Sequence, residues 1–220
     1  MLQYARIHLI CVICVKFFVV LITIMPELKS ILVYCGANSG NDSGYRESAI
    51  TLGKLLAERK IKLVYGGGSI GLMGIIADTV LAAGGEVIGV IPEFLNIKEV
   101  GHTGCTELHE VKSMHERKAL MEKLCDGVIV LPGGYGTLDE VFEMLTWSQL
   151  GLHRKPIGIL NVNGYYHHLI AQLDHMVKEG FLNANNRQLL LEDQTPLALL
   201  EKMRVFNVPV EAKWLTRPES

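Results

Sequence analysis

Apolar runs and amphipathic stretches alternate along the chain from Met25 onward. Short apolar runs rich in Val and Ile, bounded by Gly, Pro or polar residues, are typical of strands buried on both faces of a sheet. The longer stretches between them mix apolar and polar residues and favour helices. The pattern predicts strands at 30–35, 62–65, 86–91, 107–111, 126–131 and 156–160, an extended piece at 189–192, a helix that ends at 83, and further helices at 45–59, 113–124, 137–150, 165–179 and 196–205.

This alternation predicts the fold class. Strands that alternate with helices form a mostly parallel sheet with helices on both faces, so we expect a single α/β domain of Rossmann-like type. Ligands of such folds bind beyond the carboxyl ends of the strands. Glycine-rich or polar loops follow three of the predicted strands, at 36–44, 66–74 and 132–136. We therefore expect these loops to converge on one crevice.

The first 25 residues do not fit this pattern. Residues 7–25 are almost entirely apolar, which suits a membrane helix or a secretory segment, but Lys16 near the middle makes spanning costly. We favour a start of translation at Met25, which makes residues 1–25 an apolar extension without a role in the fold; a membrane anchor is the alternative. The folded domain is then 26–207, followed by a tail at 208–220. A cytoplasmic location is expected, or a membrane-anchored one if the extension is used.

Composition excludes several kinds of function. The net charge of −2 provides no basic excess to neutralise phosphates, so we expect no nucleic-acid partner. Five cysteines, an odd number unevenly spread, do not form a disulfide framework and suit a reduced compartment. Cys11-x-x-Cys14 has no second pair of Cys or His at metal-ligand spacing, so no metal site is predicted.

The stretch from Asp126 to Glu140 organises the rest of the chain. A buried strand breaks at Pro132 and three glycines and then enters a helix, which is the geometry that binds phosphate through free N–H groups and the helix dipole. One interpretation makes Thr137 the N-cap and Glu140 its partner in a capping box. The other places the Glu140 carboxylate one turn from the phosphate, facing a ribose, where it takes part in chemistry.

A second glycine loop reads Gly66-x-Gly68-x-x-Gly71, which matches the dinucleotide fingerprint literally. The fingerprint also requires an acidic residue at the end of the next strand, but Glu86 falls at the start of that strand. We therefore expect no NAD site. Gly67 and Gly68 are expected to form a second backbone cradle for a mononucleotide, and tight packing of helix on strand is the alternative.

Arg117 and Lys118 open the helix that precedes the central strand. Because a parallel β-α-β connection starts its helix at the carboxyl edge of the sheet, both cations are expected near the crevice. Cations at a helix N-terminus oppose the helix dipole, so a contact other than the dipole must favour them there. Arginine is suited to bidentate hydrogen bonds with phosphate or a purine edge.

Two motifs carry a resemblance to a known family. Residues 132–140 read Pro-Gly-Gly-Tyr-Gly-Thr-Leu-Asp-Glu, and residues 114–118 read Met-His-Glu-Arg-Lys. With them, the chain from about Ser30 to Phe206 resembles the Lonely Guy (LOG) family. Members of that family are cytokinin riboside 5′-monophosphate phosphoribohydrolases, often mislabelled as lysine decarboxylases. Segments 146–151 and 161–166 share the resemblance.

The resemblance implies hydrolysis of the N-glycosidic bond of N6-modified AMP, or of AMP, to free base and ribose 5-phosphate, with no cofactor. It also implies a homodimer with the site near the subunit interface. Arg117 and Glu140 match the catalytic pair of the family. The remaining matched positions, all implied to bind substrate, are Glu99, Lys118, Gly133, Gly134, Tyr135, Gly136, Thr137, Leu138, Asp139 and Thr146.

The chemistry agrees with these roles. Breaking an N-glycosidic bond develops positive charge on the ribose, which a carboxylate such as Glu140 can stabilise while it activates water. Arg117 can donate hydrogen bonds to the leaving base or orient Glu140. Two rivals remain. A nucleotide-binding carrier or sensor would use the same cradle without hydrolysis, and a lysine decarboxylase would need pyridoxal phosphate on a lysine, for which no lysine stands out.

Overall fold

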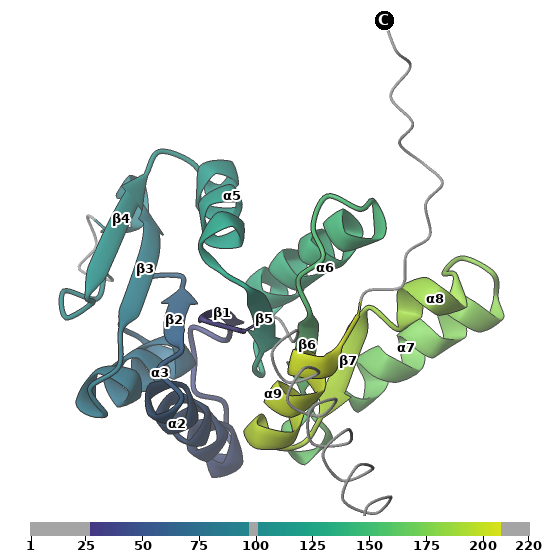
Figure 1. The fold of residues 1–220 in the computed structure, drawn as a ribbon, viewed down its shortest axis with the longest axis horizontal. Helices are drawn as coiled ribbons and strands as arrows, with labels where there is room; N and C mark the ends of the chain where they lie inside the picture. The colour runs from purple at the N-terminus through teal and green to yellow at the C-terminus, as the bar shows by residue number, and fades with distance from the viewer. Residues whose placement is uncertain (1–26, 97–100, 208–220) are drawn as a thin grey trace, which may run out of the picture.

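The computed structural model describes residues 27–96 and 101–207. Within these residues one sheet has the strand order β4-β3-β2-β1-β5-β6-β7, and every pairing between these strands is parallel (Figure 1). The strands are β1 (Ser30–Tyr34), β2 (Lys62–Tyr65), β3 (Val87–Pro92), β4 (Glu107–Val111), β5 (Gly127–Val130), β6 (Ile157–Leu160) and β7 (Leu190–Asp193). The predicted α/β class is confirmed, with a sheet that is parallel throughout.

Helices cover both faces of this sheet (Figure 1). One face carries α2 (Ser43–Glu58), α3 (Gly71–Ala82) and α9 (Pro196–Val205), and the other carries α5 (Met114–Leu124), α6 (Tyr135–Gln149) and α7 (His167–Lys178). Three short elements that the sequence pattern did not predict lie in the connections. They are α4 (Glu93–Asn96), the 3-10 turn η1 (Val162–Gly164) and α8 (Ala184–Arg187).

Strand β1 shows why the apolar runs are unbroken. Ile31 and Val33 belong to the core beneath α2, α3 and α9, whereas Leu32 and Tyr34 belong to the core beneath α5, α6 and α7. All four side chains are at most 3% exposed. Because successive side chains of a strand point to opposite faces, a strand covered on both faces must be apolar at every position.

The chain changes direction in the middle of the sheet. β1 pairs with β5, and from this pair the chain builds β2, β3 and β4 on one side and β6 and β7 on the other. Loops that follow β1 and β5 therefore diverge and leave a crevice beyond the carboxyl ends of the strands. The crevice is thus expected at the end of β5, where the glycine turn lies.

One local prediction is wrong. Thr137 is not the N-cap of a helix, because α6 begins at Tyr135 and its N-cap is Gly134, which makes no side-chain capping bond. Thr137 is the third residue of the helix and is only 4% exposed, packed against Gly133. The capping-box interpretation of Glu140 fails with it, because a capping box joins the N-cap to the third residue of the helix.

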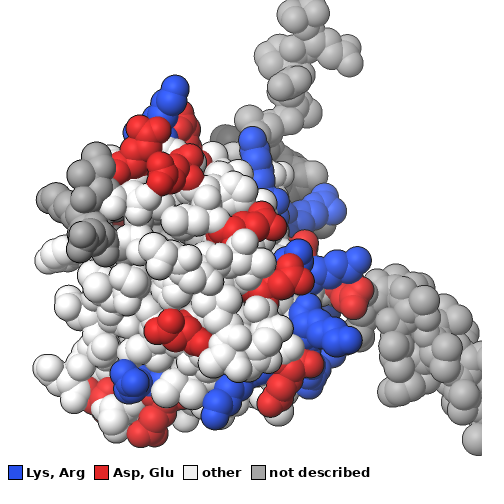
Figure 2. Space-filling model, turned by 90° about the vertical axis from the view of Figure 1, so that its left-hand side faces the viewer, with Lys and Arg blue, Asp and Glu red and all other residues white. Residues whose placement is uncertain are grey.

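The predicted extension (1–25) and tail (208–220) lie outside the described residues, which end at 207. Among the residues from 27 onward that the structure describes, no helix has the length and apolar character needed to span a bilayer. On the side of the molecule beside β4, Lys and Arg side chains lie interspersed with Asp and Glu (Figure 2).

Candidate active site

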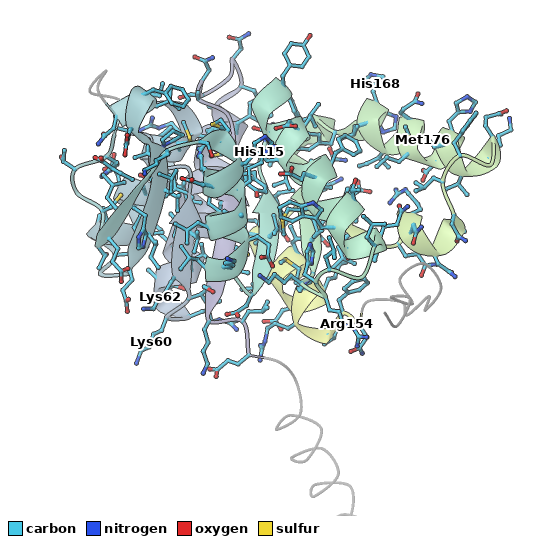
Figure 3. The ribbon with its side chains drawn as sticks, turned by 90° about the horizontal axis from the view of Figure 1, so that it is seen from above. Lys60, Lys62, His115, Arg154, His168 and Met176 are labelled. Atoms are coloured by element: carbon cyan, nitrogen blue, oxygen red, sulfur yellow. The ribbon has the colours of Figure 1, made fainter. Side chains whose placement is uncertain are left out.

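A cavity of about 560 Å³ opens at the crevice. Lys62 at the start of β2 and Arg154 before β6 lie at the opposite edge of the molecule from His168 at the start of α7, so the strands end on the His168 side (Figure 3). The cavity is lined by loops that follow β1, β2 and β5 and by residues of the helices α3 and α6, with single residues from other elements. Its polar or glycine lining comprises Gly36, Asn38, Ser39, Gly40, Gly66, Gly68, Arg117, Gly133, Gly134, Gly136, Thr137, Glu140 and Tyr165.

Arg117 and Glu140, which the resemblance implied as a pair, lie together in this cavity. The Arg117 Nη1 atom lies 3.6 Å from Glu140 Oε1, and the two side chains are only 11% and 12% exposed. Two carbonyls hold the guanidinium in place: Nε donates to the Val90 oxygen at 3.1 Å and Nη2 to the Gly66 oxygen at 3.1 Å. These bonds supply the favourable contact that a cation at the start of α5 requires.

Gly66 is required for this arrangement. A Cβ atom at position 66 would collide with Arg117 Nη2, so only glycine lets the guanidinium reach the end of β2. The bonds to Gly66 and Val90 tie Arg117 to β2 and β3, while Glu140 belongs to α6 behind β5. The pair therefore bridges the two halves of the sheet across the crevice.

Burial raises the pKa of the Glu140 carboxyl from 4.5 to about 7, and the neighbouring Arg117 charge opposes part of that rise. Tyr34 and Cys35 lie close to Glu140, and burial raises the pKa of both groups, so they stay neutral. A carboxyl with a pKa near neutrality can both accept and release a proton at physiological pH, as a general acid or base must.

The glycine turn forms the floor at the start of α6. The first N–H groups of any helix have no partner within it, and the first bond of α6 runs from the Leu138 N–H to the Gly134 oxygen. A Cβ atom added at Gly134 or Gly136 would meet nothing within 4 Å. Packing within the protein therefore does not require glycine at these positions, whereas a ligand lying against the backbone would.

The second glycine loop contributes less than predicted. Gly66 and Gly68 line the cavity, but Gly67 does not. Gly67 has a φ of +72°, and a Cβ there would crowd Ile91 of β3 and Leu108 of β4, so it packs against neighbouring strands and not, as the alternative interpretation had it, against a helix. Glu86 forms an ion pair with Lys62 at 2.6 Å, at the start of the strands, which confirms that it cannot complete a dinucleotide site.

Several predicted substrate-binding residues lie outside the cavity. Lys118 of α5 is absent from the cavity lining and bonds Asp139 at 2.9 Å and Glu143 at 3.1 Å, both of α6. Tyr135 is 94% exposed, and Thr146 donates to the Phe142 carbonyl beside a separate hollow of about 200 Å³. The cavity lining does not include Leu138. Glu99 lies outside the described residues.

Other cavity residues were not named individually by the sequence patterns. Asn38 and Ser39 belong to the polar loop after β1, which was expected to converge on the crevice together with the two glycine loops. Tyr45 and Tyr165 come from α2 and from the loop after β6, and no local pattern distinguishes them. An apolar wall made of five side chains carries no polar signal in the sequence at all. Its members are Ile70, Leu72, Met73, Ile91 and Leu95.

The fold and the site together define an α/β protein of Rossmann-like type. Its cavity lies where the chain changes direction between β1 and β5, and it contains both a helix N-terminus and a buried Arg–Glu pair. A family model described as "Possible lysine decarboxylase" matches residues 73–203. The chain belongs to this family, together with proteins named as cytokinin riboside 5′-monophosphate phosphoribohydrolases.

Two of these relatives illustrate the similarity. The "Probable cytokinin riboside 5′-monophosphate phosphoribohydrolase LOGL9" of Oryza sativa subsp. japonica is 49% identical over 184 residues, which cover 84% of this chain and 81% of the relative. The cytokinin riboside 5′-monophosphate phosphoribohydrolase LOG1 of Arabidopsis thaliana is 47% identical over 183 residues, which cover 83% and 86%.

Solved structures share the fold at lower identity. The molybdenum cofactor binding protein of Rippkaea orientalis has a TM-score of 0.61 and 22% identity, covering 80% of this chain and 94% of that one. The Moco carrier protein of Chlamydomonas reinhardtii has a TM-score of 0.60 and 19% identity, covering 80% and 98%. At these identities the likeness supports the architecture alone.

Proposed function

We propose that the protein hydrolyses the N-glycosidic bond of adenosine 5′-monophosphate carrying a substituent on N6, giving free base and ribose 5-phosphate. The observation that carries this proposal is the buried Glu140–Arg117 pair, which stands in the same cavity as the open N-terminus of α6. Close relatives named for this reaction support it. A protein that only bound a nucleotide would gain nothing from a buried carboxyl beside the phosphate site.

The phosphate is proposed to bind at the start of α6. The free N–H groups of the glycine turn and the positive end of the helix dipole favour an anion there. The vacant space beside Gly134 and Gly136 lets phosphate oxygens approach the backbone. Anchoring the phosphate fixes the ribose, so binding energy from a group that does not react positions the carbon that does.

Glu140 is proposed to act on the ribose and the attacking water. As the bond between C1′ and the base nitrogen breaks, positive charge develops on the sugar, and the Glu140 carboxylate stabilises it. The water oxygen bonds to C1′, one of its protons passes through Glu140, and the base leaves with the bonding electron pair and takes up a proton. Arg117 offers hydrogen-bond donors to the base or holds Glu140 in place.

The apolar wall is proposed to hold the base and its substituent. Ile70 and Leu95 line the cavity together with buried Ile91. An adenine ring with a hydrocarbon group on N6 would remove this surface from water, at roughly 25 cal/mol per Å². This end of the cavity therefore favours an N6-modified nucleotide over AMP.

The two rival functions fit the cavity less well. A pyridoxal-phosphate decarboxylase needs a lysine for the Schiff base, and no lysine lines this cavity within the part of the chain that the structure describes. Lys118, which follows the cavity residue Arg117 in the sequence, forms ion pairs with Asp139 and Glu143. A carrier without activity would share the architecture of the Moco carrier proteins, but it would not require the Arg117–Glu140 pair.

The test is incubation with AMP and with isopentenyladenosine monophosphate, followed by chromatography for released base. We expect ribose 5-phosphate and free base from both, faster from the modified nucleotide, and none from Glu140→Gln, which should still bind nucleotide. Glu143→Gln, an identical change one turn further along α6, is the matched control and should retain activity. Tight binding with no turnover by the unaltered protein would favour a carrier instead.

The resemblance also suggests a homodimer, and we propose this assembly because of where Thr146 lies. This residue matches a nucleotide-binding position of the family but lies outside the cavity of its own chain, and a second copy would bring such a residue to the site. Light scattering during size-exclusion chromatography measures the mass directly, and a monomer at working concentration contradicts the proposal. The predicted cytoplasmic location remains a prediction.

A further inference from the structure

Tyr165 joins the loop after β6 to the glycine turn after β5. Its hydroxyl donates a hydrogen bond of 2.8 Å to the Gly133 carbonyl, and its ring lines the cavity although the side chain is 42% exposed. Nothing in the reaction requires this residue to touch the reacting atoms. Its hydrogen bond holds the carbonyl of the Gly133–Gly134 peptide, which directly precedes α6.

Two glycines flank that peptide. It joins Gly133 to Gly134, and because glycine lacks a Cβ atom, a peptide between two glycines can rotate between opposite orientations at little cost. In a planar peptide the carbonyl and the next N–H point in opposite directions. One orientation offers the Gly134 N–H to an anion at the helix start, and the reversed one would present a carbonyl oxygen to it.

A tyrosine hydroxyl distinguishes these orientations, because it can donate to the Gly133 carbonyl only when that carbonyl faces it. We propose that Tyr165 is a positioning residue for the phosphate of the substrate, holding the Gly133–Gly134 peptide in the anion-binding orientation. The inference rests on the proposed function for the identity of the anion. It assigns a role to Tyr165 within the segment 161–166, which shares the resemblance to the family.

The surrounding contacts fix Tyr165 well enough for this role. Its ring meets Tyr45 edge-on at 5.5 Å and Tyr166 at 4.8 Å between centroids. Asn163 has a φ of +51° and Gly164 one of +73°, and these two left-handed residues turn the chain back toward β5. The Asn163 amide donates to the Asp42 carboxylate at 2.9 Å, which ties this turn to the start of α2.

The adjacent tyrosine provides a structural comparison. Tyr166 is 2% exposed and its hydroxyl donates to the Leu131 carbonyl at 2.7 Å. This bond is buried and secures the end of β5, so its loss should lower the stability of the fold. Tyr165 is exposed, and loss of its hydroxyl should alter the glycine turn with little effect on stability.

The experiment compares Tyr165→Phe, which keeps the ring contacts, with the unaltered protein and with Tyr166→Phe. Calorimetric titrations with ribose 5-phosphate and with adenine measure the two ends of the cavity separately. We expect Tyr165→Phe to bind ribose 5-phosphate roughly three- to tenfold more weakly, the usual effect of one lost neutral hydrogen bond. Adenine affinity and Tm should stay at the unaltered values, whereas Tyr166→Phe should show a lower Tm.

Three results would overturn the inference: unchanged ribose 5-phosphate affinity in Tyr165→Phe, an equal loss of affinity for adenine, or no binding of ribose 5-phosphate by the unaltered protein. Failure of the proposed function has a different signature. In that case ribose 5-phosphate would bind in a Tyr165-dependent manner while the unaltered protein released no base from AMP or isopentenyladenosine monophosphate.

Discussion

Replacing Glu140 by Gln should make the protein more stable at high pH while it abolishes turnover. The Glu140 side chain is 12% exposed, and burial raises its pKa from 4.5 to about 7. The native protein must therefore carry an ionised carboxyl in a poorly hydrated site above neutral pH, even with Arg117 beside it. A glutamine of the same shape removes that requirement.

The magnitude and the pH window follow from the two pKa values. Below pH 4.5 the carboxyl holds its proton in both the folded and the unfolded chain, so pH has no effect through this group. Between pH 4.5 and about 7 the unfolded chain releases the proton and the native protein retains it, so the free energy of unfolding falls as pH rises. Above pH 7 the full loss is reached, about 3 kcal/mol at about 1.4 kcal/mol per pH unit.

Urea denaturation of both proteins at a series of pH values from about 4 to 8, at one protein concentration, measures this difference. The free energy of unfolding of Glu140→Gln, minus that of the unaltered protein, should rise by about 3 kcal/mol across the series. If the substitution also weakens contacts with Arg117 by the same free energy at every pH, that effect does not change the slope of the difference with pH. Differences that stay the same at every pH would refute the burial of an ionised carboxyl at this site.

Three further predictions test the other parts of the cavity. Replacing Arg117 by Met removes the positive charge that lowers the pKa of Glu140, so the pKa of Glu140 should rise further. In the pH–rate profile, the limb that reports loss of the Glu140 proton should move to higher pH. A profile that does not move would exclude electrostatic coupling between the two residues. Gly134→Ala should leave Tm unchanged and raise KM for the nucleotide, whereas Gly133→Ala should lower Tm because its Cβ would collide with a neighbouring side chain; an unchanged KM for Gly134→Ala would place the phosphate elsewhere. Ile70→Ser should reduce the preference for isopentenyladenosine monophosphate over AMP by roughly tenfold in kcat/KM, and an unaltered ratio would show that the substituent does not contact this wall.

Local sequence determined the elements and the class of fold. The strand at 62–65, the strand at 107–111 and the helix at 196–205 have the bounds that the pattern predicted. Strands covered on both faces need an apolar side chain at every position. An unbroken run of apolar residues in the sequence therefore predicts a buried strand directly. The glycine turn after β5 could also be predicted from sequence, because its glycines stand close together directly after an apolar run.

The tertiary structure decided how the site is assembled. Arg117 is held beside Glu140 because its guanidinium bonds the carbonyl of Val90 in β3 and that of Gly66, which directly follows β2. Lys118, next to Arg117 in sequence, lies outside the cavity lining and bonds Asp139 of α6. The side chains of adjacent residues in a helix point about 100° apart, so two neighbouring cations lie in different environments. The packing of the helix against the sheet decides which of the two faces the cavity.

The sequence by itself determined a parallel α/β sheet, a glycine turn at the end of its central strand and the family to which the chain belongs. Only the tertiary structure decided that Glu140 is buried in the cavity instead of capping its helix, that Tyr165 bonds the glycine turn, and that one wall of the cavity is apolar. The physical reason is that strands and turns depend on neighbours in the chain. The pKa of a carboxyl and the lining of a cavity depend on residues that folding alone brings together.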